Sequence, residues 1–399
     1  MHEHTGRIDL CYFGHIGRWD DQNPYYWYGQ PSSPEILFRI ANSKPYGLTI
    51  TDIAGSIGSR PEDIQEQLSA MTGLGMLSEK DGGYSICFSV ILERDIPIIR
   101  DLAVSVAHRL ARVLLDHEED LRALAAGIGS SKQFGTARIL YHTIGCDTLD
   151  GAALDDLADM GIMATSHPRP GGRDYILQGF EHSDEVSGLS GNLLCSCNRA
   201  GTQQMQFISF GDSNGERKDF FRFLRLKDQR GPAEACRQLK LSHNPIMEKP
   251  EELILRSCAD VILRAAQPEA STDALSSEER NAADFLQELD YITISSTGAI
   301  RLRVPFFRTQ DRDVINGITE RAMELVKPLL AVELTGLSDK LAGLTSLLHG
   351  VDEREMANEL WHQVFGRMNE ELVNEGLLAK PEYIPGEGRY FRALYAGGI

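Results

Sequence analysis

Two stretches of the chain, MGIMATSHPRPGGRDYILQGF at residues 160–180 and EGLLAKPEYIPGEGRYFRALY at residues 375–395, have nearly the same pattern. Each contains a glycine and an apolar pair, then a turn rich in proline and glycine, and then an apolar strand. Gly161 and Gly376 occupy equivalent positions in the two stretches, and self-similarity at a fixed spacing indicates repeated structural units. The same spacing should therefore hold for the residues upstream of both stretches.

The upstream residues do follow this spacing. DIPIIRDLAVSVAHRLARVLL at residues 95–115 corresponds to QDRDVINGITERAMELVKPLL at residues 310–330, and both segments end in two leucines. Nearer the start of each copy, IDLCYFG at residues 8–14 is similar to MQFISFG at residues 205–211. Each of these is followed by a turn and an aromatic run, which predicts an opening β-hairpin.

We infer two copies of one unit, residues 7–182 and residues 205–399, joined by a linker at residues 183–204. Fused copies of a homodimer subunit reproduce its twofold interface within one chain, so we expect a pseudo-dimer. In the long segment 95–115, apolar residues recur at helical spacing, which predicts a helix that either packs copy against copy or lies in an ordinary core. These apolar positions are Ile99, Leu102, Val106, Leu110, Val113 and Leu114.

The composition sets limits on location and partners. The chain has 399 residues, 42% of them hydrophobic, and lacks a run of apolar residues long enough to cross a membrane. Its first residues, MHEHTGRIDL, lack the basic and apolar stretches of a signal peptide, so we expect a cytoplasmic protein with no membrane partner. The formal net charge of −18 disfavours non-specific attraction to nucleic acid, so any DNA contact must be local.

Seven cysteines are expected to be reduced and mainly buried in a chain with no secretory signal. Cys195 and Cys197 form the one close pair in the sequence, and no second pair stands at the spacing of a zinc site. We therefore expect no metal and no cofactor.

Residues 35–92 read as three short helices and a hairpin. The first helix covers residues 35–41, and Thr49 with Asp52 three residues later marks the start of the second. Ser59 and Glu62 form the pattern of a capping box that opens the third helix, and residues 76–88 alternate as a β-hairpin.

This order resembles the winged helix-turn-helix of bacterial transcriptional regulators. The resemblance is carried by TxxDIAxxIG at residues 49–58 and by the helix, glycine and hairpin at residues 64–88. It recurs more weakly at residues 251–307, where Ser276 and Glu279 form the pattern of a capping box. It implies an α+β, mainly helical fold, a tandem pseudo-twofold repeat of winged-helix units with long connecting helices and β-hairpins. The opening stretches predict a second winged element in each copy, at residues 150–180 and 366–396.

In such a fold the third helix enters the major groove, with basic neighbours holding phosphates. Here the outer face of that helix is acidic, so basic residues elsewhere are needed. If residues 217–230 form a strand, one face is apolar and the other basic; the alternative is the solvated face of a half-buried hairpin. The candidate DNA-binding residues are Arg60, Gln65, Lys80, Arg217, Lys218, Arg222, Arg225, Arg301 and Arg303.

An aromatic run and two histidines are candidates for holding a ligand between the copies. The run could line a pocket or pack the N-terminal hairpin, and the histidines could meet across the pseudo-twofold axis or lie in the core. These residues are Tyr25, Tyr26, Trp27, Tyr28, His142 and His362.

Nothing in the sequence points to catalysis. Asp212 and Ser213 resemble the serine block of GDSL esterases, but no histidine has an aspartate three residues before it, and phosphate-binding loops are absent. We therefore expect a DNA-binding transcriptional regulator that is not an enzyme, with DNA and a small-molecule or peptide effector as partners. The alternative is a winged-helix module that binds a protein, peptide or ligand and has left DNA.

Overall fold

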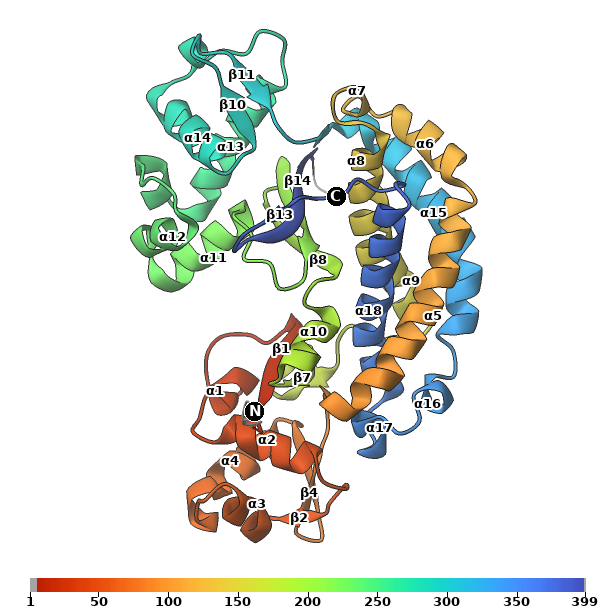
Figure 1. Cartoon of the computed structure of the whole chain (residues 1–399). Coiled ribbons are helices and arrows are strands. Elements are labelled where there is room, and N and C mark those ends of the chain that lie inside the picture. Colours follow the sequence, from red (N-terminus) through yellow and green to blue (C-terminus); the bar gives the residue numbers. More distant parts are fainter. Residues whose placement is uncertain (1–5, 398–399) are drawn as a thin grey trace. The chain divides into compact units, whose positions relative to one another are not determined.

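The computed structural model describes residues 6–397 and shows an α+β protein with 54% of its residues in helices and 17% in strands. The mainly helical class is therefore confirmed. The chain, coloured along its sequence in Figure 1, forms two compact units. Of the described residues, unit 1 contains 6–110, 153–191 and 327–367, and unit 2 contains 111–152, 192–326 and 368–397. Each unit thus takes segments from both halves of the sequence.

Residues 33–86 of unit 1 form a compact helical element, here called element A. Thr49 begins its second helix with a capping box, in which the Thr49 N–H donates to Asp52 Oδ2 at 2.9 Å. The capping box expected at Ser59 is absent, because Arg60 is the residue that precedes the third helix. Element A consists of α2 (Ser33–Ala41), β2 (Leu48–Thr49), α3 (Ile50–Ser56), α4 (Pro61–Gly73), β3 (Leu77–Lys80) and β4 (Gly83–Ile86), with strand order β2-β4-β3.

The first of the two similar stretches forms the centre of a sheet in unit 1. β7 (Arg173–Glu181) pairs antiparallel with β1 (Ile8–His15) and parallel with β5 (Ser89–Ile91), while β6 (Pro168–Arg169) pairs with its start. A Cβ at Gly179 would lie 2.8 Å from a methyl carbon of Ile8, so glycine is needed for this packing. The predicted hairpin is present, but its second strand is central to the sheet and is not the wing of a separate element.

Residues 251–302 of unit 2, here called element B, repeat the order of element A. The predicted capping box is confirmed, since the Ser276 N–H donates to Glu279 Oε2 at 2.8 Å and the Glu279 N–H donates to Ser276 Oγ at 3.3 Å. An isolated bridge between Ser271 and Ala299 lies where element A has β2. Element B consists of α13 (Glu251–Ala265), η5 (Thr272–Ala274), α14 (Ser277–Glu288), β10 (Ile292–Ile294) and β11 (Ile300–Leu302).

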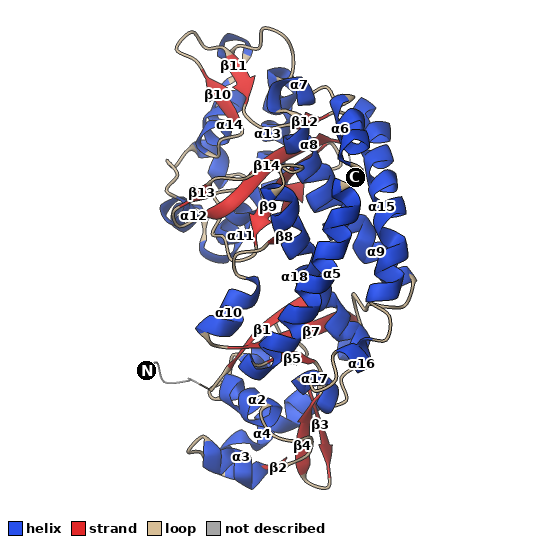
Figure 2. Cartoon of the chain, turned by 45° about the vertical axis from the view of Figure 1, so that its right-hand side comes forward, coloured by secondary structure: helices blue, strands red, loops and turns tan. Residues whose placement is uncertain are grey.

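The second similar stretch is the central strand of the unit 2 sheet. β14 (Gly388–Ala396) pairs antiparallel with β9 (Met205–Asp212) and with β13 (Tyr383–Ile384), and parallel with β12 (Phe306–Phe307). The strand directions therefore match those around β7. One strand is additional, because the expected linker folds into α10 (Asp184–Ser190) and into β8 (Leu194–Gly201), which pairs with β9 (Figure 2).

The opening hairpins predicted for both copies are wrong. β1 is followed by the helix α1 (Pro24–Tyr28), and β9 is followed by α11 (Phe220–Arg230) and α12 (Pro232–Leu239). Polar side chains start these helices, because Asn23 accepts from the Tyr25 N–H at 2.9 Å and Asp219 accepts from the Arg222 N–H at 2.8 Å. A capped helix start outweighs the alternating pattern.

Helices make up the rest of both units. In the expected stripe of α5, Ile99, Val106, Leu110 and Leu114 are buried, as a core stripe requires. The remaining elements are α5 (Ile96–Leu115), α6 (Glu118–Ala126), α7 (Ser131–Phe134), α8 (Thr136–Leu140), η2 (Tyr141–Ala152), α9 (Ala153–Asp159), α15 (Arg312–Glu333), α16 (Leu337–Lys340), α17 (Thr345–Leu348) and α18 (Glu353–Asn374), with 3-10 turns η1 (Glu93–Asp95), η3 (Pro170–Gly172), η4 (Pro245–Glu248) and η6 (Thr309–Asp311).

η2 is a π-helix of 12 residues, which is an uncommon structure that often marks functional sites. Its counterpart in the C-terminal half is the continuous helix α18. Ser130 and Ser346 occupy equivalent positions in the two halves of the sequence, as do Gly161 and Gly376. The interval from Ser130 to Gly161 is one residue longer than the interval from Ser346 to Gly376. An extra residue in a helix is accommodated by the wider i→i+5 turn, which accounts for the position of η2.

Candidate functional site

The surface of element A carries three of the predicted DNA-binding residues. The Arg60 guanidinium forms two bonds with Asp63, at 2.9 and 2.7 Å, and this pair lowers the pKa of the Asp63 carboxyl. Gln65 and Lys80 are exposed. The helix α4 also exposes Glu62 and Glu66, so its outer face is acidic. Arg60, the arginine that precedes this helix, is already paired with Asp63.

The basic run at residues 217–230 is a helix and not a strand. Arg217 precedes it and is only 1% exposed, because it donates to the backbone oxygens of Ser209 at 2.9 Å and Asp212 at 2.7 Å. The prediction that Arg217 contacts DNA is therefore wrong, since its charge holds the turn after β9. Lys218 is half-buried beside it.

The remaining arginines of this run line a hollow of about 420 Å³ between α11, β8 and the turn after β9. Arg222 is half-buried and pairs with Glu216 at 2.7 Å, whereas Arg225 and Arg230 are exposed. Ser196 and Asn198 add polar groups from β8. The hollow therefore has an excess of positive charge and suits an anionic ligand.

A larger groove of about 910 Å³ lies beside the hairpin of element B. Its basic lining residues come from three segments: Lys132 from α7, Arg301 from β11 and Arg308 from the residues after β12. All three are exposed. Arg303, the other residue predicted from this hairpin, pairs with Asp290 at 2.9 Å and does not line the groove.

The aromatic run forms α1 and packs on β1. Tyr25 Oη donates to the Leu10 carbonyl at 2.7 Å, Tyr28 Oη donates to the Ile8 carbonyl at 3.0 Å, and Trp27 Nε1 donates to the Asp21 carbonyl at 2.9 Å. The rings of Tyr25 and Tyr28 meet edge to face, as do those of Tyr26 and Trp27. Of the two interpretations, this geometry favours packing over a ligand pocket.

The two candidate histidines belong to different units. His142 lies in η2 of unit 2, and burial lowers its pKa well below the usual range. His362 lies in the part of α18 that belongs to unit 1, where its Nδ1 lies 2.8 Å from the Asn358 carbonyl oxygen and burial lowers its pKa. Each is therefore a neutral histidine within its own unit, in line with the core interpretation.

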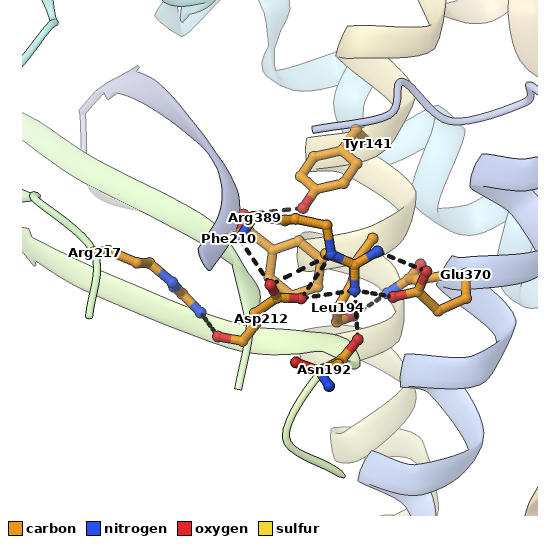
Figure 3. Close-up of polar contacts among 9 residues, drawn as sticks. Tyr141, Asn192, Leu194, Phe210, Asp212, Arg217, Glu370 and Arg389 are labelled. Carbon is orange, nitrogen blue, oxygen red and sulfur yellow. Dashed lines mark hydrogen bonds and ion pairs between the residues drawn. The ribbon is translucent and has the colours of Figure 1, made fainter. Parts of the chain in front are cut away.

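An ion network joins β9, β14 and α18 in unit 2 (Figure 3). Arg389 donates to Asp212 at 2.8 Å and to Glu370 at 2.6 Å, and it also bonds to the Asn192 carbonyl oxygen. These carboxylates raise the pKa of Arg389. Asp212, which in the sequence resembled part of an esterase motif, is therefore paired with Arg389. Arg389 connects the sheet strands β9 and β14 to the helix α18.

A pocket of about 350 Å³ opens beside Asp147, in the middle of η2. Tyr395 Oη donates to Asp147 Oδ2 at 2.7 Å, and both residues line the pocket. Burial raises the pKa of the Asp147 carboxyl to about 6. Sequence reasoning missed this pair, because no local pattern connects residues that lie so far apart in the chain.

Sequence reasoning also missed Cys146, which lies in η2 next to Cys197 of β8.

Among residues 6–397, no group of three or more histidine, cysteine, aspartate or glutamate side chains is arranged to hold a metal ion. In the same range, no helix combines the length and apolar character that crossing a membrane requires. Comparisons with protein-family models, curated proteins and solved structures find no match.

Proposed function

We propose that the protein is a winged-helix, DNA-binding transcriptional regulator built as a fused pseudo-dimer. The observation that carries the proposal is the arrangement of element A, in which a helix, a short strand, two helices and a hairpin follow one another and β2 pairs with β4. That is the order of a winged helix-turn-helix. Element B has the same order, with the Ser271–Ala299 bridge in place of β2.

Reciprocal contacts support the pseudo-dimer. In unit 1, Ser346 Oγ accepts from the Val90 N–H and donates to the Val90 carbonyl, both at 2.7 Å. In unit 2, Ser130 Oγ accepts from the Phe306 N–H at 3.1 Å and donates to the Phe306 carbonyl at 2.6 Å. The two serines are separated in the sequence by the same interval as Val90 and Phe306. Each half of the sequence thus holds the other in the same way, as exchanged subunits of a homodimer do.

The DNA contact is assigned to element B. Its groove presents Lys132, Arg301 and Arg308, exposed cations that suit phosphate oxygens. The acidic α4 of element A would instead repel a phosphate backbone. The hollow lined by Arg222 and Arg225 is the place we assign to an anionic effector.

A salt titration of duplex binding tests this assignment. Fluorescence anisotropy of a labelled duplex is measured for the wild type and for Lys132→Gln/Arg301→Gln at several salt concentrations. Loss of two phosphate contacts is expected to weaken binding at low salt and to reduce the slope of log K against log salt by about 2. The matched control is Lys44→Gln/Arg100→Gln, which removes the same charge from exposed positions in unit 1. Equal losses in both double variants would contradict a local contact at element B.

One observation favours the second candidate function, a winged-helix module that binds a protein or peptide. The exposed face of α4 carries Glu62, Asp63 and Glu66, which suits a basic peptide better than DNA. Under this alternative the wild type does not bind duplex DNA even at low salt, and Glu62→Gln/Glu66→Gln weakens capture of a lysine-rich peptide.

A further inference from the structure

Two thiols meet inside unit 2 where β8 passes η2. Cys146 and Cys197 are both free, and their sulfur atoms lie 3.1 Å apart. A disulfide bond is about 2.05 Å long, so the sulfurs need to approach by only about 1 Å to form one. Cys197 is half-buried and Cys146 is fully buried, so a small oxidant reaches Cys197 first.

The surroundings give the two sulfurs different roles. Arg199 Nε donates to Cys197 Sγ at 3.3 Å, and Arg199 Nη2 lies 3.9 Å from Cys146 Sγ. The Cys146 thiol donates to Cys197, which together with the Arg199 guanidinium lowers the pKa of Cys197. The same bond and burial raise the pKa of Cys146 well above its usual range. The pKa of Cys197 is thus the lower of the two, so Cys197 is the thiol that ionises first and Cys146 is the one that keeps its proton.

The neighbouring acids do not cancel this arrangement. Burial raises the pKa of the Asp150 carboxyl well above its usual range, which favours its neutral form beside Cys197. Asp147 is the one acid nearby that ionises close to neutral pH, and its Oδ2 is held by Tyr395 at 2.7 Å. Arg199 remains the charge that acts directly on both sulfurs.

We propose that Cys197 and Cys146 form a peroxide-reactive thiol pair that closes to a disulfide between β8 and η2. The Cys197 thiolate attacks the terminal oxygen of a hydroperoxide, the O–O bond breaks, and a sulfenic acid and an alkoxide or hydroxide result. The Cys146 sulfur then attacks the Cys197 sulfur, the S–O bond breaks, and the hydroxyl leaves with the Cys146 proton as water. The two thiols are oxidised by two electrons, and the hydroperoxide is reduced to an alcohol or, from hydrogen peroxide, to water.

Three other cysteines provide internal controls. Burial raises the pKa of Cys258 beyond the physiological range, that of Cys11 to about 12, and that of Cys236 above its usual value. Cys236 Sγ lies 3.3 Å from Met247 Sδ, so it has a sulfur neighbour but no resolving thiol. These cysteines share burial or a sulfur neighbour with the Cys146–Cys197 pair, but their pKa values are raised. If burial or contact with sulfur were sufficient for oxidation, they would react as readily as Cys197.

The test treats the full-length reduced protein with one equivalent of hydrogen peroxide, blocks the remaining thiols by alkylation, and identifies the products by peptide mass spectrometry. The expected result is loss of two of the seven thiols and a single cross-linked peptide joining Cys146 to Cys197. Oxidation of any other cysteine first, or a pair that stays reduced while others react, would overturn the proposal.

Variants separate the roles and guard against simple misfolding. Cys197→Ser is expected to slow peroxide consumption at least about tenfold, because the thiolate is the nucleophile. Cys146→Ser should leave a Cys197 sulfenic acid that dimedone traps, whereas Cys236→Ser should react as the wild type does. Arg199→Gln keeps both sulfurs and should move the pH profile of the Cys197 reaction upward; an unchanged profile would refute the role of Arg199. The inference is independent of DNA binding.

Discussion

Replacing Arg389 by methionine removes the cation from the buried network of unit 2. Arg389 bonds to Asp212 and Glu370, and the Asp212 side chain is only 5% exposed. Removing one partner of a buried ion pair costs about 3 to 5 kcal/mol, because the remaining charge is left without compensation. Arg389 keeps 19% exposure, so we expect a loss near the lower end, about 3 kcal/mol.

The assay is urea unfolding followed by far-UV circular dichroism, with amide hydrogen exchange to locate the loss. All three tryptophans, Trp19, Trp27 and Trp361, belong to unit 1, so fluorescence follows that unit while hydrogen exchange in β9 and β14 follows unit 2. Arg389→Met should lower protection in β9 and β14 most. A chain of two units can unfold in more than one step. The value from each probe in the variant is therefore compared with the value from the same probe in the wild type.

Two variants sharpen this measurement. Arg389→Met/Asp212→Asn should recover part of the loss, because the unpaired charge is gone. The matched control is Arg237→Met, since Arg237 makes a similar two-bond pair with Glu234, at 2.8 and 2.5 Å, on an exposed surface. Exposed pairs contribute little, so this variant should be close to the wild type. Equal effects of Arg389→Met and Arg237→Met would refute the reasoning.

Three further predictions concern stability. Ser346→Ala and Ser130→Ala should each destabilise the protein by about 1 to 3 kcal/mol in urea unfolding, because each leaves the backbone groups of Val90 or Phe306 without partners; Ser346 is the more buried and should cost more. Oxidation of Cys146 and Cys197 closes a loop of about 50 residues, which the chain-entropy estimate values at about 4 kcal/mol, so the thermal midpoint should fall when dithiothreitol is added. Burial raises the pKa of Glu359 to about 7 in the folded protein, above its value in the unfolded chain, so stability should be lost as pH rises from about 5 to 7; Glu359→Gln should remove up to about 3 kcal/mol of this dependence, and an unchanged pH profile would contradict it.

Local patterns in the sequence were sufficient where the decisive interactions are local. The helices and hairpin of element A, the capping box at Ser276 and the similar strands around residues 173–181 and 388–396 were all predicted from short patterns and are present. The capping box at Ser59 failed because the helix starts one residue later than the pattern suggests, with Arg60 outside it.

Long-range contacts account for what was missed. Residues 217–230 alternate as a strand would, but Asp219 caps a helix there and Phe220 and Phe223 are buried in the core. Residues 183–204 lack a clear pattern, yet part of them becomes β8 because β9 offers a free edge. No sequence pattern could place Cys146 beside Cys197, since a π-helix determines where that thiol points.

Selection of genomic DNA fragments by the purified protein tests the central claim most directly. Fragments retained at several salt concentrations are sequenced and compared. The account predicts that the retained fragments share a sequence motif of a size that element B alone can contact, and that their retention weakens as salt rises. Retention of no fragment even at low salt would contradict a DNA-binding regulator and would favour the peptide-binding alternative.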